Sequence, residues 1–116
     1  MSSGAALRGS PLSGGYAGAK ATVRFISAYA GLEAARHALD IRFVSVLPQI
    51  TPATDLGAKY VEAYAGYQGL DVETYLSQLG PTLSLAQAGE CVVELASGGD
   101  YTETAYLLNG SGLIPV

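Results

Sequence analysis

The sequence predicts an α/β fold in which short parallel strands are joined by helices, and three observations indicate it. A long Ala-rich segment with helical spacing precedes an apolar, β-branched run that ends at a proline. A second strand-like run follows three helical segments near the C-terminus. The chain has 116 residues, of which 49% are apolar and 14% charged, so it is one domain or part of one and not intrinsically disordered.

The N-terminal half predicts a loop, a long helix, a strand and a second loop. Residues 1–15 are rich in Gly and Ser and predict a loop with a strand end at its very start. Residues 16–39 predict one helix, because apolar side chains recur at spacings of three and four: Val23, Ile26, Ala30 and Ala34. Residues 41–47 predict a strand covered on both faces, since nearly every position is apolar, and residues 48–54 predict a loop with two prolines.

The C-terminal half predicts three helices and a second strand. The helices are expected at residues 55–67, 71–79 and 81–96, the last beginning at a proline. Residues 105–108 predict a strand that ends in an Asn-Gly turn. Because helices separate the two strands, we expect them to pair in parallel. A sheet of two parallel strands is not stable alone, so the first strand is expected to find a neighbour at its open edge.

Composition excludes several classes of function. A single cysteine, Cys91, excludes a disulfide framework, and a single histidine, His37, argues against a zinc site, so no metal is expected. No apolar run is long enough to span a membrane, and the N-terminus lacks the pattern of a signal peptide, which predicts a cytoplasmic protein. The net charge is −4, with seven acids and no Lys or Arg after residue 59, so neither nucleic acid nor an anionic membrane is an expected partner.

The segment Tyr16-Ala17-Gly18-Ala19-Lys20 carries the clearest chemistry. On a helix, residues four apart share a face, so Lys20 would place its ammonium beside the Tyr16 phenol and favour the phenolate. Such a tyrosine can give or take a proton near neutral pH. Ser3 lies thirteen residues upstream, where its hydroxyl would bind the same substrate oxygen. The alternative interpretation is an ordinary pair of side chains on a helix surface.

This pattern resembles the short-chain dehydrogenase/reductase family over residues 2–21 and, more loosely, over the whole chain. The resemblance implies that Tyr16 is the catalytic acid/base, that Lys20 supports it and holds the nicotinamide ribose, and that Ser3 polarises the substrate carbonyl, with Ser2 as the alternative register. It also implies NAD or NADP as cofactor and a small alcohol or carbonyl compound as substrate. Further cofactor contacts would follow the first strand, at Pro48, Ile50, Thr51 and Thr54. Gln49 departs from the family, which has Gly there.

The resemblance implies the C-terminal part of a Rossmann-like doubly wound fold, in a single partial domain of residues 1–116. Residues 1–54 would hold the serine loop, the Tyr/Lys helix and a strand, residues 55–104 a helical lid, and residues 105–116 the last strand and a tail. The Gly-rich turn that binds the dinucleotide in a Rossmann half has no counterpart between a strand and a helix.

Three functions are therefore compatible with the sequence. In the first, the chain is the C-terminal portion of an oxidoreductase that transfers a hydride. In the second, it is a non-catalytic remnant that self-associates. In the third, it is one chain of a split enzyme whose Rossmann half docks at the open edge of strand 41–47. Self-association would use the helix at 16–39, whose small residues allow close approach: Ala17, Ala21, Ala28, Gly31 and Ala35.

The remaining chemical side chains are each more readily explained by structure than by catalysis. Cys91 is expected as a buried apolar side chain and His37 as a surface residue near a helix end. The tyrosines of the lid region are expected to pack the short helices, with lining of a substrate pocket as the alternative: Tyr60, Tyr64, Tyr67 and Tyr75.

Overall fold

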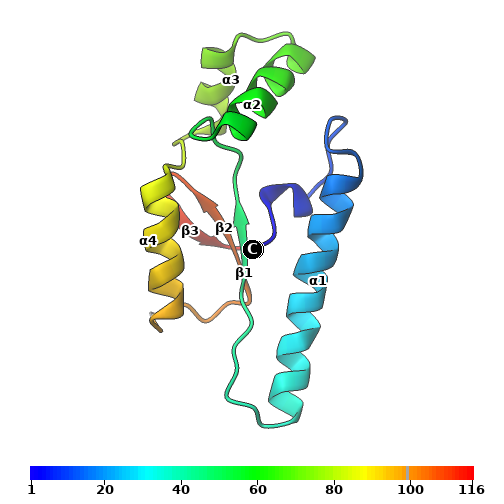
Figure 1. Cartoon of the computed structure of the whole chain (residues 1–116), viewed down its shortest axis with the longest axis vertical. Coiled ribbons are helices and arrows are strands. Elements are labelled where there is room, and N and C mark those ends of the chain that lie inside the picture. The colour runs from blue at the N-terminus through cyan, green and yellow to red at the C-terminus, as the bar shows by residue number, and fades with distance from the viewer. Residues whose placement is uncertain (99) are drawn as a thin grey trace.

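The protein is an α/β chain with a three-stranded mixed sheet, two α-helices beside the sheet and two beyond its end, as a computed structural model shows for residues 1–98 and 100–116 (Figure 1). The elements in chain order are η1 (Gly4–Ala6), α1 (Gly14–Arg36), β1 (Ser45–Pro48), α2 (Asp55–Gln68), α3 (Val72–Leu79), α4 (Leu85–Ala96), β2 (Ala105–Asn109) and β3 (Gly112–Pro115). The α/β class predicted from the sequence is confirmed. Among the described residues, no helix is long and apolar enough to cross a bilayer.

The sheet has the order β1-β2-β3. β1 and β2 pair in parallel, with Val46 opposite Tyr106, so the predicted parallel pair is confirmed. β3 was not predicted: residues 112–115 were expected as a tail, but they fold back on β2 antiparallel. The Asn109 side chain makes this return possible, because its oxygen accepts a hydrogen bond from the Ser111 N–H at 2.8 Å in the turn.

Three predicted boundaries were wrong. The long helix ends at Arg36 rather than at 39, because Ala38 has a φ of 52°, outside the right-handed helical region. The first strand begins at Ser45 rather than at 41, since residues 39–44 have no strand partner and belong to no helix or strand. The last helix begins at Leu85 rather than at Pro81, because Ser84 caps it through a hydrogen bond from the Gln87 N–H at 3.2 Å.

Two separate apolar clusters hold the fold together. The first lies between the sheet and α4 and contains Val46, Leu83, Cys91 and Leu108. The second lies between α2 and α3 and contains Val61, Ala65 and Tyr75, with partly buried side chains around them. The α2–α3 pair therefore packs on a core of its own, beyond the end of β1 (Figure 1).

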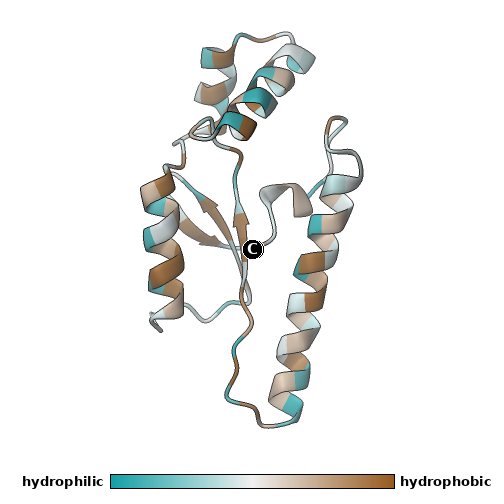
Figure 2. Ribbon diagram, in the orientation of Figure 1, coloured by the Kyte–Doolittle hydropathy of each residue, from teal (hydrophilic) through white to brown (hydrophobic). Residues whose placement is uncertain are grey.

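The molecule is elongated and leaves much apolar surface open. Its extents are 51 × 28 × 20 Å and its radius of gyration is 15.5 Å, whereas a compact domain of this length has a radius of about 13 Å. α1 lies on the opposite side of β1 from α4 (Figure 1), and apolar residues occur all along both helices (Figure 2). An exposed apolar surface of this extent is typical of a face that another molecule covers.

Candidate functional site

Tyr16 and Lys20 lie side by side in the first two turns of α1. The Lys20 Nζ is 5.7 Å from the centre of the Tyr16 ring, within the range of a cation–π contact. Tyr16 is 53% exposed, and Lys20 is partly buried. The pair thus presents a phenol that a solvent-borne ligand can reach, with a cation beside it.

The loop in front of α1 is closed by two serines. The Ser13 hydroxyl donates to the Ser10 carbonyl at 2.7 Å and accepts a hydrogen bond from the Ser10 N–H at 2.9 Å. Gly14 then opens the helix with a φ of 47°, a conformation that favours glycine. This local turn sets the direction in which the chain enters α1, and it therefore orients the face that carries Tyr16.

Ser2 and Ser3 have different environments. Ser2 is 4% exposed; its hydroxyl donates to the Lys20 carbonyl at 2.7 Å, and its N–H donates to the Val46 carbonyl at 2.8 Å. The Ser3 hydroxyl accepts a hydrogen bond from the Ala5 N–H at 3.3 Å, which leaves its own proton available to an acceptor. Ser2 therefore ties the N-terminal segment to α1 and β1, while Ser3 is the serine with a hydroxyl proton to offer.

The residues expected to contact a cofactor after β1 already have partners within the chain. The Thr51 hydroxyl donates to the Leu83 carbonyl at 2.5 Å, and the Thr54 hydroxyl accepts from the Gly57 N–H at 3.0 Å as the N-cap of α2. Ile50 packs against the α2–α3 cluster, and Pro48 is the last residue of β1, opposite Leu108. These side chains build the connection between the sheet and α2.

Gln49, which departs from the family pattern, has a structural role of its own. Its N–H continues the sheet by donating to the Leu108 carbonyl at 2.8 Å. Its side-chain amide donates to the Leu79 carbonyl at 3.1 Å, at the end of α3. A glycine could not make the second contact, so glutamine here fixes the end of α3 beside β1.

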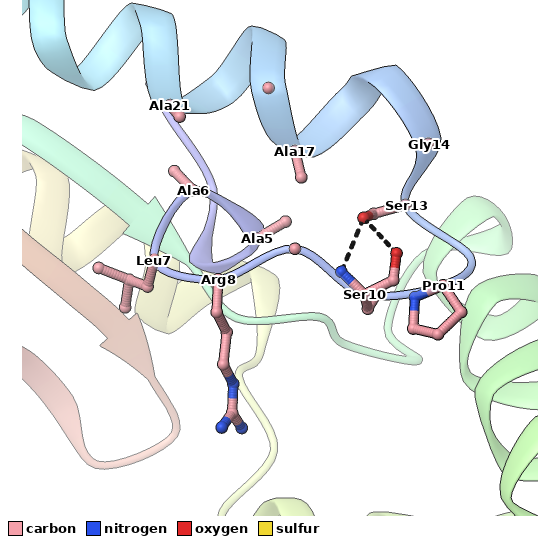
Figure 3. Close-up of a pocket in the computed structure, with 12 residues that line it drawn as sticks. Ala5, Ala6, Leu7, Arg8, Ser10, Pro11, Ser13, Gly14, Ala17 and Ala21 are labelled. Atoms are coloured by element: carbon pink, nitrogen blue, oxygen red, sulfur yellow. Dashed lines mark hydrogen bonds between the residues drawn. The ribbon is translucent and has the colours of Figure 1, made fainter.

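A recess of about 690 Å³ lies between the loop that follows η1 and the first turns of α1. Figure 3 shows that Ala17 and Ala21 face it from α1 and that Arg8 points away from it. Tyr16 and Lys20 do not line the recess, because they lie on a neighbouring face of the helix. The recess is wide and open, and small side chains form most of its lining. No motif in the sequence indicated it.

Comparison with known proteins does not supply a family. No family model matches this chain, and no curated protein or solved structure matches it. The assignment of function therefore rests on the residues and their geometry.

The other side chains considered for chemistry have structural surroundings. Burial raises the pKa of the Cys91 thiol, with smaller contributions from Glu94 and Glu90, so this cysteine is a poor nucleophile at neutral pH. His37 lies at the end of α1 with its Nε2 3.6 Å from the exposed Glu33 carboxylate.

The four tyrosines of residues 55–79 divide into two kinds. Tyr60 and Tyr67 are 44% and 61% exposed. Tyr64 and Tyr75 instead stack with ring centres 6.3 Å apart and planes 5° from parallel. Burial, and to a smaller extent Tyr64, raises the pKa of Tyr75. The interpretation as packing residues thus fits Tyr64 and Tyr75, whereas Tyr60 and Tyr67 remain accessible.

Proposed function

We propose that this chain is the C-terminal part of an NAD(P)-dependent oxidoreductase of the short-chain type, with a partial Rossmann-like fold, that interconverts an alcohol and a carbonyl compound. The observation that carries the proposal is the contact between the Lys20 ammonium and the Tyr16 ring at 5.7 Å on an accessible face of α1. The parallel pairing of β1 with β2 through helical connections is in keeping with such a fold.

In the proposed reaction Tyr16 and Ser3 act on the substrate oxygen, and Lys20 acts on Tyr16. Tyr16 donates its phenolic proton to the carbonyl oxygen during reduction and takes it back during oxidation. Lys20 stabilises the phenolate that is left, and Ser3 donates its hydroxyl proton to the same substrate oxygen. NAD or NADP, when bound, exchanges a hydride with the substrate carbon.

The described residues fit one end of the dinucleotide only. Tyr16 and Lys20 offer a phenol and an ammonium to the nicotinamide ribose, whereas the Thr51 hydroxyl donates to the Leu83 carbonyl and the Thr54 hydroxyl accepts the Gly57 N–H as the N-cap of α2. The sequence has no Gly-rich turn between a strand and a helix to hold the pyrophosphate. The proposal thus requires a further polypeptide segment for that end. At the outer edge of β1 the Val46 carbonyl already accepts the Ser2 N–H, so a strand added there would lie beyond the N-terminal segment or displace it.

A fluorescence titration with NADH and NADPH tests the proposal directly. The chain contains no tryptophan, so the nicotinamide signal is read without interference from indole. Weak but saturable binding through the nicotinamide end is expected for the wild-type chain and loss of binding for Lys20→Ala, with Lys59→Ala on α2 as the control that keeps binding. Absence of binding by a chain that circular dichroism shows to be folded would reject a working nicotinamide site in this chain alone.

A second candidate function is self-association through α1. The helix presents small or polar side chains to its own chain, among them Ala17 and Ala34, which are 7% and 3% exposed. Its opposite side carries Phe25, Tyr29 and Leu32, which are 71%, 47% and 72% exposed. An apolar stripe that faces solvent is typical of a surface that another molecule covers. Part of the Ala/Gly face that was expected to mediate self-association is therefore buried within the chain. The apolar stripe of Phe25, Tyr29 and Leu32 is the surface left for a partner.

A further inference from the structure

The turn between β2 and β3 contains a chemically reactive pair of residues, Asn109-Gly110. An asparagine followed by glycine is especially prone to spontaneous deamidation, because no side chain shields the nitrogen of the glycine. Asn109 is also the only asparagine in the sequence. A single position of the chain can therefore undergo this reaction through asparagine.

Deamidation at this position needs no reactant other than water. The Gly110 nitrogen loses its proton and bonds to the Asn109 Cγ, while the bond from Cγ to the side-chain nitrogen breaks and ammonia leaves with the proton. Water then opens the resulting succinimide ring at either of its two carbonyls. One opening gives aspartate. The other gives isoaspartate, in which the main chain runs through the former side chain and is one methylene longer.

The folded chain holds the attacking nitrogen in a hydrogen bond. The Gly110 N–H donates to the Pro81 carbonyl at 3.1 Å, so the proton that must leave is engaged. A Cβ at position 110 would lie 2.4 Å from the Pro81 carbonyl carbon, so this close approach requires glycine. The packing of the turn thus demands the residue that makes Asn109 reactive, and the same packing restrains it.

Three further contacts hold the turn in place. The Asn109 Oδ1 accepts the Ser111 N–H at 2.8 Å, and Asn109 is paired with Gly112 in the ladder between β2 and β3. The Gly110 carbonyl accepts the side-chain amide of Gln87 at 2.9 Å, which ties the turn to α4 (Figure 1). Asn109 and Gly110 are both partly exposed, so water reaches them. These contacts, rather than exclusion of water, restrain the reaction.

We propose that Asn109 is a deamidation site that the fold keeps closed through the contacts of Gly110 with Pro81 and Gln87, and that it reacts only in molecules in which this turn has opened. The proposal does not depend on the oxidoreductase function, because it concerns contacts within the chain alone. A reaction that requires a local opening proceeds at a rate set by the population of the open form. Deamidation of Asn109 is therefore a record of how often the β2–β3 turn opens.

The two products are expected to affect the fold differently. Aspartate retains an oxygen that accepts the Ser111 N–H, so Asn109→Asp, which reproduces this product, is expected to keep β3 paired with β2. Isoaspartate lengthens the main chain where Asn109 pairs with Gly112, so it shifts the register of β3.

Mass spectrometry of the incubated chain tests the proposal. Cleavage after Glu103 releases residues 104–116, in which the asparagine, aspartate and isoaspartate forms are separated by chromatography. The folded chain is compared, at the same mildly alkaline pH, with chain unfolded in guanidinium chloride. We expect deamidation to be slower by about tenfold or more in the folded chain, because most molecules are closed. Equal rates, or no deamidation of the unfolded chain, would overturn the proposal.

A variant and its control separate the closing contacts from general stability. Gln87→Ala removes the side-chain contact with the Gly110 carbonyl and is expected to accelerate deamidation several-fold. Gln68→Ala, at an exposed position of α2, is expected to leave the rate unchanged. Circular dichroism verifies that both variants are folded. Equal rates in Gln87→Ala and the wild-type chain would overturn the proposal, as would equal acceleration by both substitutions.

Hydrogen exchange at the Gly110 amide gives a measurement that needs no variant. Because this N–H donates to the Pro81 carbonyl, its exchange in the wild-type chain is expected to be slowed relative to the unfolded chain. A Gly110 amide that exchanges as fast as in the unfolded chain would overturn the proposal.

Discussion

Lys20 holds its ammonium 5.7 Å from the centre of the Tyr16 ring, one helical turn away on the same face of α1. The Lys20 carbonyl also accepts the Ser2 hydroxyl, at 2.7 Å. The residue that supports the phenol is therefore also the residue through which the N-terminal serine segment is joined to α1. Because Ser3 follows Ser2 in the chain, this double contact ties the position of Ser3 to that of the Tyr16–Lys20 pair.

Tyr16→Phe is expected to remove proton transfer while leaving nicotinamide binding by Lys20 in place. If Tyr16 is the acid/base, reduction of small ketones with NADH or NADPH falls by about 100-fold or more. A panel of ketones and secondary alcohols, assayed with the wild-type chain, Tyr16→Phe and the control Tyr67→Phe, measures the effect. Turnover that is equal in wild type and Tyr16→Phe would contradict the assigned role.

Self-association is expected to depend on the exposed stripe of α1. Phe25→Glu or Leu32→Glu places a charge where a second molecule would cover the helix, so either variant is expected to be monomeric. Light scattering across a concentration series gives the mass. The matched control is Leu56→Glu on α2, which is 67% exposed and outside the stripe. A wild-type chain that stays monomeric at every concentration would exclude this interface.

Stability is expected to decline in alkaline solution because of Cys91. Burial raises the pKa of its thiol in the folded chain above the ordinary value of 9.0, so the unfolded thiol ionises first. The folded state then binds more protons than the unfolded state, and the free energy of unfolding falls as the pH rises through 9.0 toward the folded pKa. Thermal unfolding at several pH values measures the fall, which Cys91→Ala should make shallower. An identical slope in the variant would assign the effect to other groups.

Gly57→Ala and Gly66→Ala, both in α2, are expected to have opposite effects. A Cβ at position 57 would lie 1.9 Å from the Thr51 carbonyl oxygen, so alanine would displace the connector that enters α2. At position 66 a Cβ would meet no heavy atom within 4 Å outside the backbone of its own helix, and alanine stabilises a helix by roughly 0.5–1 kcal/mol relative to glycine. Chemical denaturation of the two variants checks this. Equal effects would show that α2 does not approach the Thr51 carbonyl so closely.

The sequence by itself determined the features that depend on neighbouring residues. Spacing of apolar side chains was sufficient for α1, and the predicted helices at residues 55–67 and 71–79 lie within one residue of α2 and α3. The proximity of Tyr16 and Lys20 was also predictable, because it follows from the pitch of one helix. The parallel pairing of β1 and β2 followed from the length of the connection between them.

Only the tertiary structure decided the features that join distant parts of the chain. The start of β1 at Ser45 depends on a ladder partner some sixty residues away, and β3 exists because β2 offers it an edge. The hydroxyls of Thr51 and Thr54 read as ligand contacts in the sequence, yet Thr51 bonds to Leu83 and Thr54 caps its own helix. The link between Ser10 and Tyr64 leaves no pattern in either segment, since a hydrogen bond between hydroxyls imposes no periodicity on the residues around it.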